Sequence, residues 1–405
     1  MSVPFRPILS ALLRNRAGAI LVALQVAITL AVLVNAVYIV KQRVELINRP
    51  TGIDVDNIFV VSVTGFSKQF NYNAMLDEDI GWLSSIPGVL GVTATNAVPL
   101  SRSGSSDIAK PTPEDKPSQK YLVEYFHYNE QGADALGLKV IAGRWFRREE
   151  VHAPLATNFT PYSGPVVLSR DYADKMFPNG AVGKVLYGSD NQPMTIVGVV
   201  DHMLSSRLTK VDNPEDAMFM ALEPTGPTTR YVVRVKPGLR DQLMRKVEAE
   251  IGPRNEMRAV EDVQALSLYL AHSYRTDRNM AIYLVVVTAL LLAITALGIF
   301  ALATFNVSTR TKQIGTRRAV GARRRDLVAH FLVENWIITT GGLLAGCVFA
   351  LAAGYWLSLE YALPRVDLYY IVGGVLIMWL IGLAAAWHPS RRAARISPAL
   401  ATRTV

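Results

Sequence analysis

The chain has 405 residues, of which half are apolar and 19% charged, and its mean hydropathy is +0.22. This composition excludes a disordered chain, because such chains lack the apolar residues that offset the entropy of ordering. A single cysteine, Cys347, excludes a disulfide framework and a cysteine-based zinc site. The net charge of +9 would suit a nucleic-acid-binding protein, so the placement of that charge has to decide the question.

Four apolar runs predict four membrane-spanning helices, which we place at 17–40, 280–307, 331–359 and 368–388. Each run contains an uncharged stretch of about 20 residues or more, the length that crosses the hydrocarbon core of a bilayer. The first run could instead be a cleaved signal peptide. It is longer than the apolar region of such a peptide, about 7–15 residues, so we favour an uncleaved signal anchor.

Basic residues are concentrated in three short segments, 1–16, 308–330 and 389–405, which together hold 14 basic residues and one acidic residue. The long segment 41–279 holds 27 basic and 29 acidic residues. Positively charged short loops remain on the cytoplasmic side of a membrane. We therefore expect both termini to be cytoplasmic, 41–279 to be an exported domain and 360–367 to be a short external loop. The same distribution argues against a nucleic-acid partner.

The exported segment 41–279 alternates strand-like and helix-like stretches, which is typical of a mixed α+β domain. Strands are expected at 57–63, 91–95, 164–168, 194–200 and 230–235, with helices ending near Ser85, near 171–177 and at 239–251. The stretch from Ser101 to Lys120 is rich in Ser, Pro, Lys and Asp, and we expect it to be a mobile loop. The strand order does not follow from one sequence.

No catalytic motif is recognisable in the chain. The six histidines are scattered, and Gly183-Lys184 lacks the remainder of a phosphate-binding loop. Asp201-His202 follows a predicted strand, but no nucleophile accompanies it, so we interpret it as an end-of-strand loop pair. We expect no catalytic, cofactor-binding or metal-binding residue and no ATPase activity in this chain. The apolar runs also lack the ionisable residues of an ion-coupled carrier.

Small residues form stripes at helical spacing in the first and third runs. Their members are Ala19, Ala23, Ala27, Ala31 and Asn35 in the first run, and Gly342, Gly346, Ala350 and Gly354 in the third. Such stripes allow helix backbones to approach closely, and an asparagine can hydrogen-bond across the interface. We expect close helix packing here, either within one protomer or between two.

The segment 308–330 is the best candidate for a docking surface. Seven basic residues lie between Arg310 and Arg325, interleaved with small and apolar residues. Juxtamembrane positive charge can also serve only to set topology and to contact anionic lipid. The interleaved pattern favours protein docking.

Several motifs resemble the MacB/FtsX-like permeases of ABC transporters. The resemblance rests on Gln313–Leu327 running into Phe331–Glu334, and on Ile86–Val89, Leu136–Phe146, Phe177-Pro178 with Gly183-Lys184, Ile196–Val200 and Ser397–Leu400. It covers nearly the whole chain. The family usually has an acidic residue where this chain has Gln313, so an ion pair made there in relatives is absent from this sequence.

The resemblance implies a protomer of one span, an exported domain and three further spans, which dimerises as a homodimer or heterodimer in the inner membrane. The exported domain would contain a split βαβ-like subdomain and a second subdomain inserted into it. A coupling helix between spans two and three would rest on a cytoplasmic ABC ATPase, here a separate chain that binds ATP and Mg²⁺. We assign coupling to Gln313, Gly315, Arg317, Arg318, Gly321, Arg323 and Arg324.

In the family, ATP hydrolysis moves the exported domains, which is called mechanotransmission. Members expel drugs, peptides or toxins with a periplasmic adaptor and an outer-membrane channel. Efflux of that kind is the function we expect. Extraction of lipoproteins and non-transporting regulation of a cell-wall hydrolase are the alternatives. An unpartnered scaffold or receptor would not need the docking segment.

Overall fold

The computed structural model describes residues 16–66, 72–152, 162–208, 213–224, 228–361 and 366–396. Most of the N-terminal segment 1–16, part of the loop 360–367 and the motif Ser397–Leu400 lie outside the described residues. The chain divides into two compact units, Met1–Asn48 with Thr276–Val405 and Arg49–Arg275. We call them the membrane unit and, after the side expected from the charge distribution, the exported unit, and each is described by itself.

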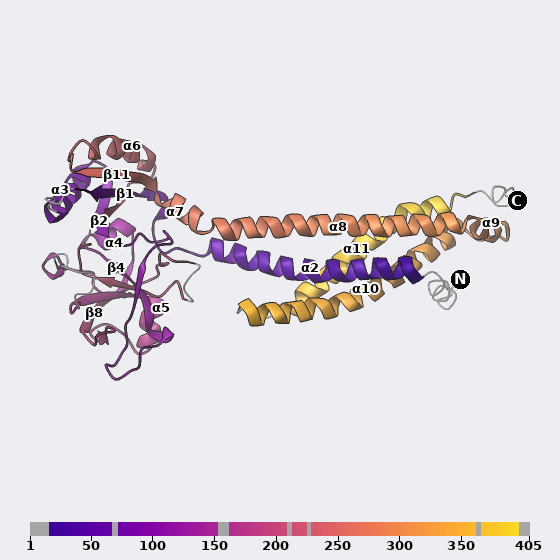
Figure 1. Cartoon of the computed structure of the whole chain (residues 1–405), viewed down its shortest axis with the longest axis horizontal. Coiled ribbons are helices and arrows are strands. Elements are labelled where there is room, and N and C mark those ends of the chain that lie inside the picture. The colour runs from indigo at the N-terminus through magenta and orange to yellow at the C-terminus, as the bar shows by residue number, and fades with distance from the viewer. Residues whose placement is uncertain are drawn as a thin grey trace. The chain divides into compact units, whose positions relative to one another are not determined.

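The membrane unit is built from long helices (Figure 1). They are α2 (Arg16–Asn48), α8 (Arg275–Thr309), α10 (Arg324–Tyr361) and α11 (Leu368–Ala393), with the short α9 (Thr311–Ala319) between α8 and α10. Within the described part of the chain, these four long helices are the ones apolar enough to cross a membrane. Each extends beyond its apolar run, because charged residues continue a helix outside the hydrocarbon core without cost.

Helix α2 lies at the centre of the packing in the membrane unit. Its Val26, Leu30 and Val34 are fully buried in a core shared with α10 and α11. The buried hydroxyls of Thr29 on α2 and Thr295 on α8 are hydrogen-bonded, with 2.8 Å between their oxygens. A hydroxyl in an apolar interior needs such a partner, so the pair fixes the rotation of one helix against the other.

A four-stranded sheet forms one part of the exported unit. Its strands are β1 (Ile58–Gly65), β2 (Val89–Thr95), β10 (Thr228–Val235) and β11 (Arg258–Ala265), in the order β11-β1-β10-β2 with antiparallel neighbours. Strands β1 and β2 are connected by α3 (Tyr72–Ser85), and β10 lies between them in the sheet. These elements therefore form a split βαβ unit. Helix α6 (Arg240–Ile251) connects β10 to β11 in the same way.

The second part of the exported unit is inserted between β2 and β10, and we call it the inserted subdomain. Its mixed sheet has the order β3-β4-β9-β6-β8-β5, with β7 also paired to β8. The strands are β3 (Ser105–Ile108), β4 (Leu122–His127), β5 (Val140–Gly143), β6 (Pro165–Ser169), β7 (Val185–Tyr187), β8 (Pro193–Val200) and β9 (Ala217–Met220). The helices are α4 (Gly132–Leu136) and α5 (Arg170–Met176). The predicted fold class, a split βαβ-like subdomain with an insertion beside four spans, is confirmed.

The shorter elements complete the exported unit. They are η1 (Val55–Asn57), η2 (Gln119–Tyr121), η3 (Arg148–Glu150) and α7 (Leu266–Ser273). The five strands predicted from sequence correspond to β1, β2, β6, β8 and β10.

The prediction of a loop from Ser101 to Lys120 is correct for most of the stretch, which has no regular secondary structure, and wrong for Ser105–Ile108. This stretch contains β3, which pairs with β4, and a buried lysine, Lys110. The Lys110 ammonium group donates hydrogen bonds of 2.9 Å to the carbonyl oxygens of Pro113 and Asp115. These bonds satisfy the ammonium group inside the fold, which composition does not reveal.

Candidate coupling surface and helix interface

Helix α9 is a separate short helix between two spans. It ends in a reversal at Gly321, whose φ is +98°. The amide of Ala322 donates to the carbonyl of Arg317 at 3.0 Å, and the amide of Gly321 donates to that of Arg318 at 3.1 Å. These two bonds form a Schellman motif, which requires a left-handed residue after the helix and favours glycine there. The chain reverses direction at this turn, and α10 then begins at Arg324.

One face of α9 is packed against the ends of three spans. Ile314 is 3% exposed and Gly315 is also buried. The apolar cluster around Ile314 contains Val307, Leu327, Phe331 and Ala393, with Ile396 against it. This burial gives α9 a fixed rotation about its own axis.

Two arginines fasten the two ends of α9. The guanidinium of Arg310, which precedes the helix, lies 3.0 Å from a carboxylate oxygen of Glu334 on α10. Arg318, in the last turn, donates a 2.7 Å hydrogen bond to the carbonyl of Ile396 beyond α11. Charge-assisted hydrogen bonds of this kind are stronger than neutral ones. Helix α9 is therefore anchored to α10 and to the segment after α11.

The opposite face of α9 is exposed and mostly cationic. Gln313, Arg317 and Val320 follow one another at helical spacing, and Arg323 and Arg324 continue the surface past the turn; all five are exposed. Val320 is 84% exposed and is the apolar member of this set. We call these five residues, after the role expected from the sequence, the coupling surface. Three of the coupling residues predicted from sequence lie outside this surface. Gly315 is buried, Arg318 binds the Ile396 carbonyl and anchors α9, and Gly321 forms the turn.

Sequence reasoning missed the Glu334 carboxylate. An apolar-run criterion treats this residue as the boundary of a span, whereas α10 already begins at Arg324 and the Glu334 side chain is 3% exposed. One of its oxygens pairs with Arg310, and the other has no hydrogen-bond partner within the described residues. The spacing from Arg310 to Glu334 gives no local signal, because the two residues lie on different helices.

The two small-residue stripes face each other within one chain. A Cβ atom added at Gly342 would lie 2.5 Å from the Ala23 carbonyl oxygen, and one at Gly346 would lie 3.0 Å from Ala27. The Asn35 amide donates to the carbonyls of Ala31 at 2.9 Å and of Ala350 at 3.2 Å. Gly354 lies against Asn35 as well, whereas Ala19 is a half-buried member of the same core. The stripes thus bring the backbones of α2 and α10 together.

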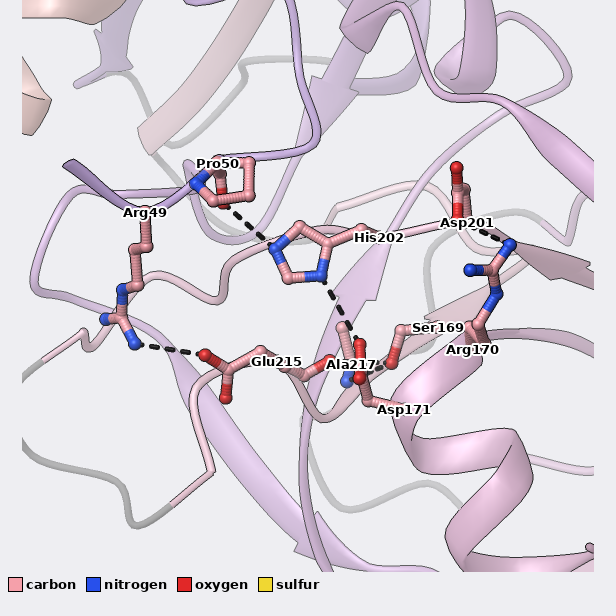
Figure 2. A network of polar contacts seen from close by, with 9 residues as sticks. All are labelled: Arg49, Pro50, Ser169, Arg170, Asp171, Asp201, His202, Glu215 and Ala217. Atoms are coloured by element: carbon pink, nitrogen blue, oxygen red, sulfur yellow. Dashed lines mark hydrogen bonds and ion pairs between the residues drawn. The ribbon is translucent and has the colours of Figure 1, made fainter. Parts of the chain in front are cut away.

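The pair Asp201-His202 lies in a polar network of the exported unit (Figure 2). Asp201 pairs with Arg170 at 2.7 Å, and the two ring nitrogens of His202 contact Asp171 at 3.3 Å and the Pro50 carbonyl at 2.9 Å. Both side chains therefore hold the segment after β8 against the first turn of α5, and His202 also contacts Pro50. In the described residues, no group of three or more His, Cys, Asp or Glu side chains is arranged to hold a metal ion.

Comparisons with known proteins cover both units. A family model described as FtsX-like permease C-terminal matches residues 285–398, and one described as MacB-like periplasmic core domain matches 19–250. The macrolide export ATP-binding/permease protein MacB of Escherichia coli (strain K12) is 26% identical over 248 residues, covering 58% of this chain and 37% of that protein.

The macrolide export ATP-binding/permease protein MacB of Campylobacter jejuni (strain 81-176) is 25% identical over 280 residues, covering 65% of this chain and 41% of that protein. The chain therefore spans about two fifths of the length of these relatives. A crystal structure of the periplasmic region of MacB from Actinobacillus actinomycetemcomitans matches with 16% identity and a TM-score of 0.33, covering 54% of this chain and 92% of that one.

Four apolar helices joined to an interrupted α/β domain, with these two family models along the chain, define an ABC-transporter permease of the membrane. The periplasmic core model covers more than half of the chain. The chain belongs to the MacB/FtsX-like permeases.

Proposed function

We propose that this chain couples ATP hydrolysis by an ABC ATPase on a separate polypeptide to movements of its exported unit, with efflux of drugs, peptides or similar compounds as the result. The ATPase binds ATP and Mg²⁺, and this chain contributes no catalytic residue. The macrolide-export names of the relatives support efflux as the output.

The observation that carries the proposal is the construction of α9. Its inner face is buried around Ile314 and its ends are anchored through Arg310 and Arg318, so a force applied to the outer face reaches α8, α10 and the end of α11. The coupling surface presents several arginines and one exposed apolar side chain. That combination suits a partner with an acidic, partly apolar groove.

The assembly that we propose lies in a bacterial inner membrane with both termini in the cytoplasm. Two protomers, identical or different, would form the membrane part, and a periplasmic adaptor and outer-membrane channel would complete the route. Cysteine accessibility tests the orientation. A cysteine at exposed Glu248 should react with an impermeant maleimide in intact cells, and one at exposed Arg325 should react only after lysis. The reverse pattern would contradict this topology.

The coupling assignment is tested by purifying the tagged chain in a gentle detergent from its native membrane and identifying co-purified proteins. We expect an ABC ATPase with the wild type and its loss in the Arg317→Glu, Arg324→Glu double variant. The matched control is Arg391→Glu with Arg392→Glu, which removes equal charge from exposed positions on α11. Arg318 is left intact because it anchors α9. Undiminished recovery in the first variant would refute the coupling surface.

The output is tested separately by deleting the chain in its source organism. Increased sensitivity to macrolides, peptides or related compounds supports efflux. Retention of lipoproteins in the inner membrane would instead support lipoprotein extraction. A cell-separation defect would support regulation of a wall hydrolase.

In the co-purification experiment, failure to recover any ATPase under conditions that preserve the dimer would point to a scaffold or receptor.

A further inference from the structure

The chain segment that follows α2 is bound along its length to the inserted subdomain. We call residues 49–52 the junction segment. The amide of Leu204 donates to the Thr51 carbonyl at 3.0 Å, and His202 Nε2 lies 2.9 Å from the Pro50 carbonyl. Gly52 has a φ of +80°, and a Cβ atom there would lie 2.0 Å from the His202 carbonyl oxygen. The two backbones are therefore in direct contact.

Arg49 connects three separate parts of the chain at this junction. Its guanidinium contacts a carboxylate oxygen of Glu215 at 3.0 Å and the carbonyl of Leu208 at 3.3 Å, both in the inserted subdomain. Its Nε donates to the Tyr274 hydroxyl at 3.0 Å, next to the start of α8. The Arg49 side chain is only 15% exposed, so these contacts are largely shielded from water. A guanidinium suits this position because its five donors point in fixed directions.

The partner side of Arg49 is itself held in place (Figure 2). The Ser169 hydroxyl donates to the Glu215 carbonyl at 2.7 Å and accepts from the Ala217 amide at 3.0 Å. Ser169 ends β6 and Ala217 begins β9, so Glu215 is fixed between two strands of the inserted sheet. Arg49 therefore binds a segment whose backbone is hydrogen-bonded to the end of β6.

A second set of contacts lies where the chain leaves the exported unit. The Ser273 hydroxyl donates to the carbonyl of Leu100, a fully buried residue with a φ of +66°. The Leu100 amide in turn donates to the Ser205 carbonyl at 3.2 Å. A left-handed conformation is uncommon for a bulky residue, so it persists only where surrounding contacts hold it. These contacts tie the exit before α8 to the same loop region that holds the junction segment.

The topology explains what this arrangement achieves. The inserted subdomain is covalently joined to the four-stranded sheet by two connections, one after β2 and one before β10. Helix α4 of the insertion also packs against β2 and β10, where a Cβ atom at Gly91 would lie 2.7 Å from the Ala135 amide nitrogen, so the contacts at the junction segment are a second, separate attachment. We propose that Arg49 is a positioning residue that clamps the inserted subdomain to the points of entry and exit, so that displacement of α2 and α8 moves both subdomains together. This inference rests on the function proposed above.

The test uses spin labels on the full chain with its ATPase in lipid nanodiscs. Cys347 is replaced by Ser, and labels are attached at Asp174→Cys on α5 and Glu248→Cys on α6, both exposed positions. In the wild-type background, we expect one narrow distance distribution that is the same without nucleotide and after trapping with ATP and vanadate. A wild-type distance that changes with nucleotide would overturn the clamp.

The Arg49→Ala variant should at least double the width of that distribution and make its mean depend on nucleotide. Arg49→Lys keeps the charge facing Glu215 but cannot reach all three partners, so an intermediate width is expected, and it serves if Arg49→Ala fails to fold. Arg144→Ala is the matched control, because the ion pair of Arg144 among the described residues is a local one with Glu150. It should leave the distribution narrow.

The remaining outcomes separate the clamp from the proposed function. A wild-type distribution in folded Arg49→Ala overturns the clamp. A broad distribution without nucleotide dependence would give Arg49 a static role and overturn its part in transmission. The width measured without nucleotide does not depend on any ATPase. Failure of the proposed function would appear instead in the co-purification experiment, as an absence of ATPase.

Discussion

The contact between α2 and α10 can be tested by one methyl group placed at two neighbouring positions. In Gly342→Ala the new Cβ would lie 2.5 Å from the Ala23 carbonyl oxygen and 2.9 Å from Val26 Cβ. Ordinary contact begins near 3.4 Å, so the helices must separate by roughly 0.9 Å at this point. In Gly341→Ala the new Cβ would have no neighbour within 4 Å.

The magnitude follows from what the two variants share. Replacing a helical glycine by alanine stabilises a helix by about 0.5–1 kcal/mol, and this gain is common to both. Overpacking a tight interface costs about 1–3 kcal/mol and applies only at Gly342. We therefore expect the free energy of unfolding of Gly342→Ala to be about 1–3 kcal/mol lower than that of Gly341→Ala. Equilibrium unfolding by SDS in mixed micelles measures the difference. Equal stabilities would refute the close approach of α2 and α10.

Two further predictions concern buried ionisable groups. Arg310→Ala should destabilise the protein by about 3–5 kcal/mol, because it leaves the Glu334 carboxylate buried and unpaired. Adding Glu334→Leu should recover most of this loss in the same unfolding assay, and simply additive effects would contradict the buried pair. Burial lowers the pKa of His127 from 6.5 to about 4, so the folded state favours the neutral ring. The resulting contribution of His127 to the free energy of unfolding is about 3 kcal/mol. It should be fully present above pH 6.5 and be lost as the pH decreases towards 4. Thermal unfolding against pH should show a shallower acid loss in His127→Phe, and parallel curves would refute the assignment.

The spans and the repeated small residues could be predicted because their signals are local. A helix that crosses a bilayer must carry its own apolar run, so α2, α8, α10 and α11 are visible in the sequence. The same holds for strands such as β1 and β10, which are largely buried and contain three valines each. The family motif around Gly321 was equally visible, because a Schellman turn needs glycine at a fixed place.

The clamp and the anchors could not be predicted, because they join residues that are far apart in the sequence. Arg49 meets Glu215 and Tyr274, and Arg310 meets Glu334, only after the helices and sheets have formed. In the sequence, Arg317 and Arg318 are equally good candidates for coupling. Burial separates them, since Arg318 reaches the Ile396 carbonyl while Arg317 stays exposed. Neighbouring residues of a helix point in different directions, and one residue type can therefore have two roles.

The insertion between β2 and β10 has a consequence for how the chain is made. Strand β1 pairs with β10 and β11. Phe59 therefore lies opposite Val233 and Ala265, which are separated from it by most of the sequence of the exported unit. During synthesis β1 emerges long before either partner, whereas the strands of the inserted sheet follow one another within one continuous stretch. Because loop closure favours nearby partners, the inserted sheet can close first and the four-stranded sheet forms last. Until then β1 is an unpaired apolar strand, the kind of segment that chaperones protect from aggregation.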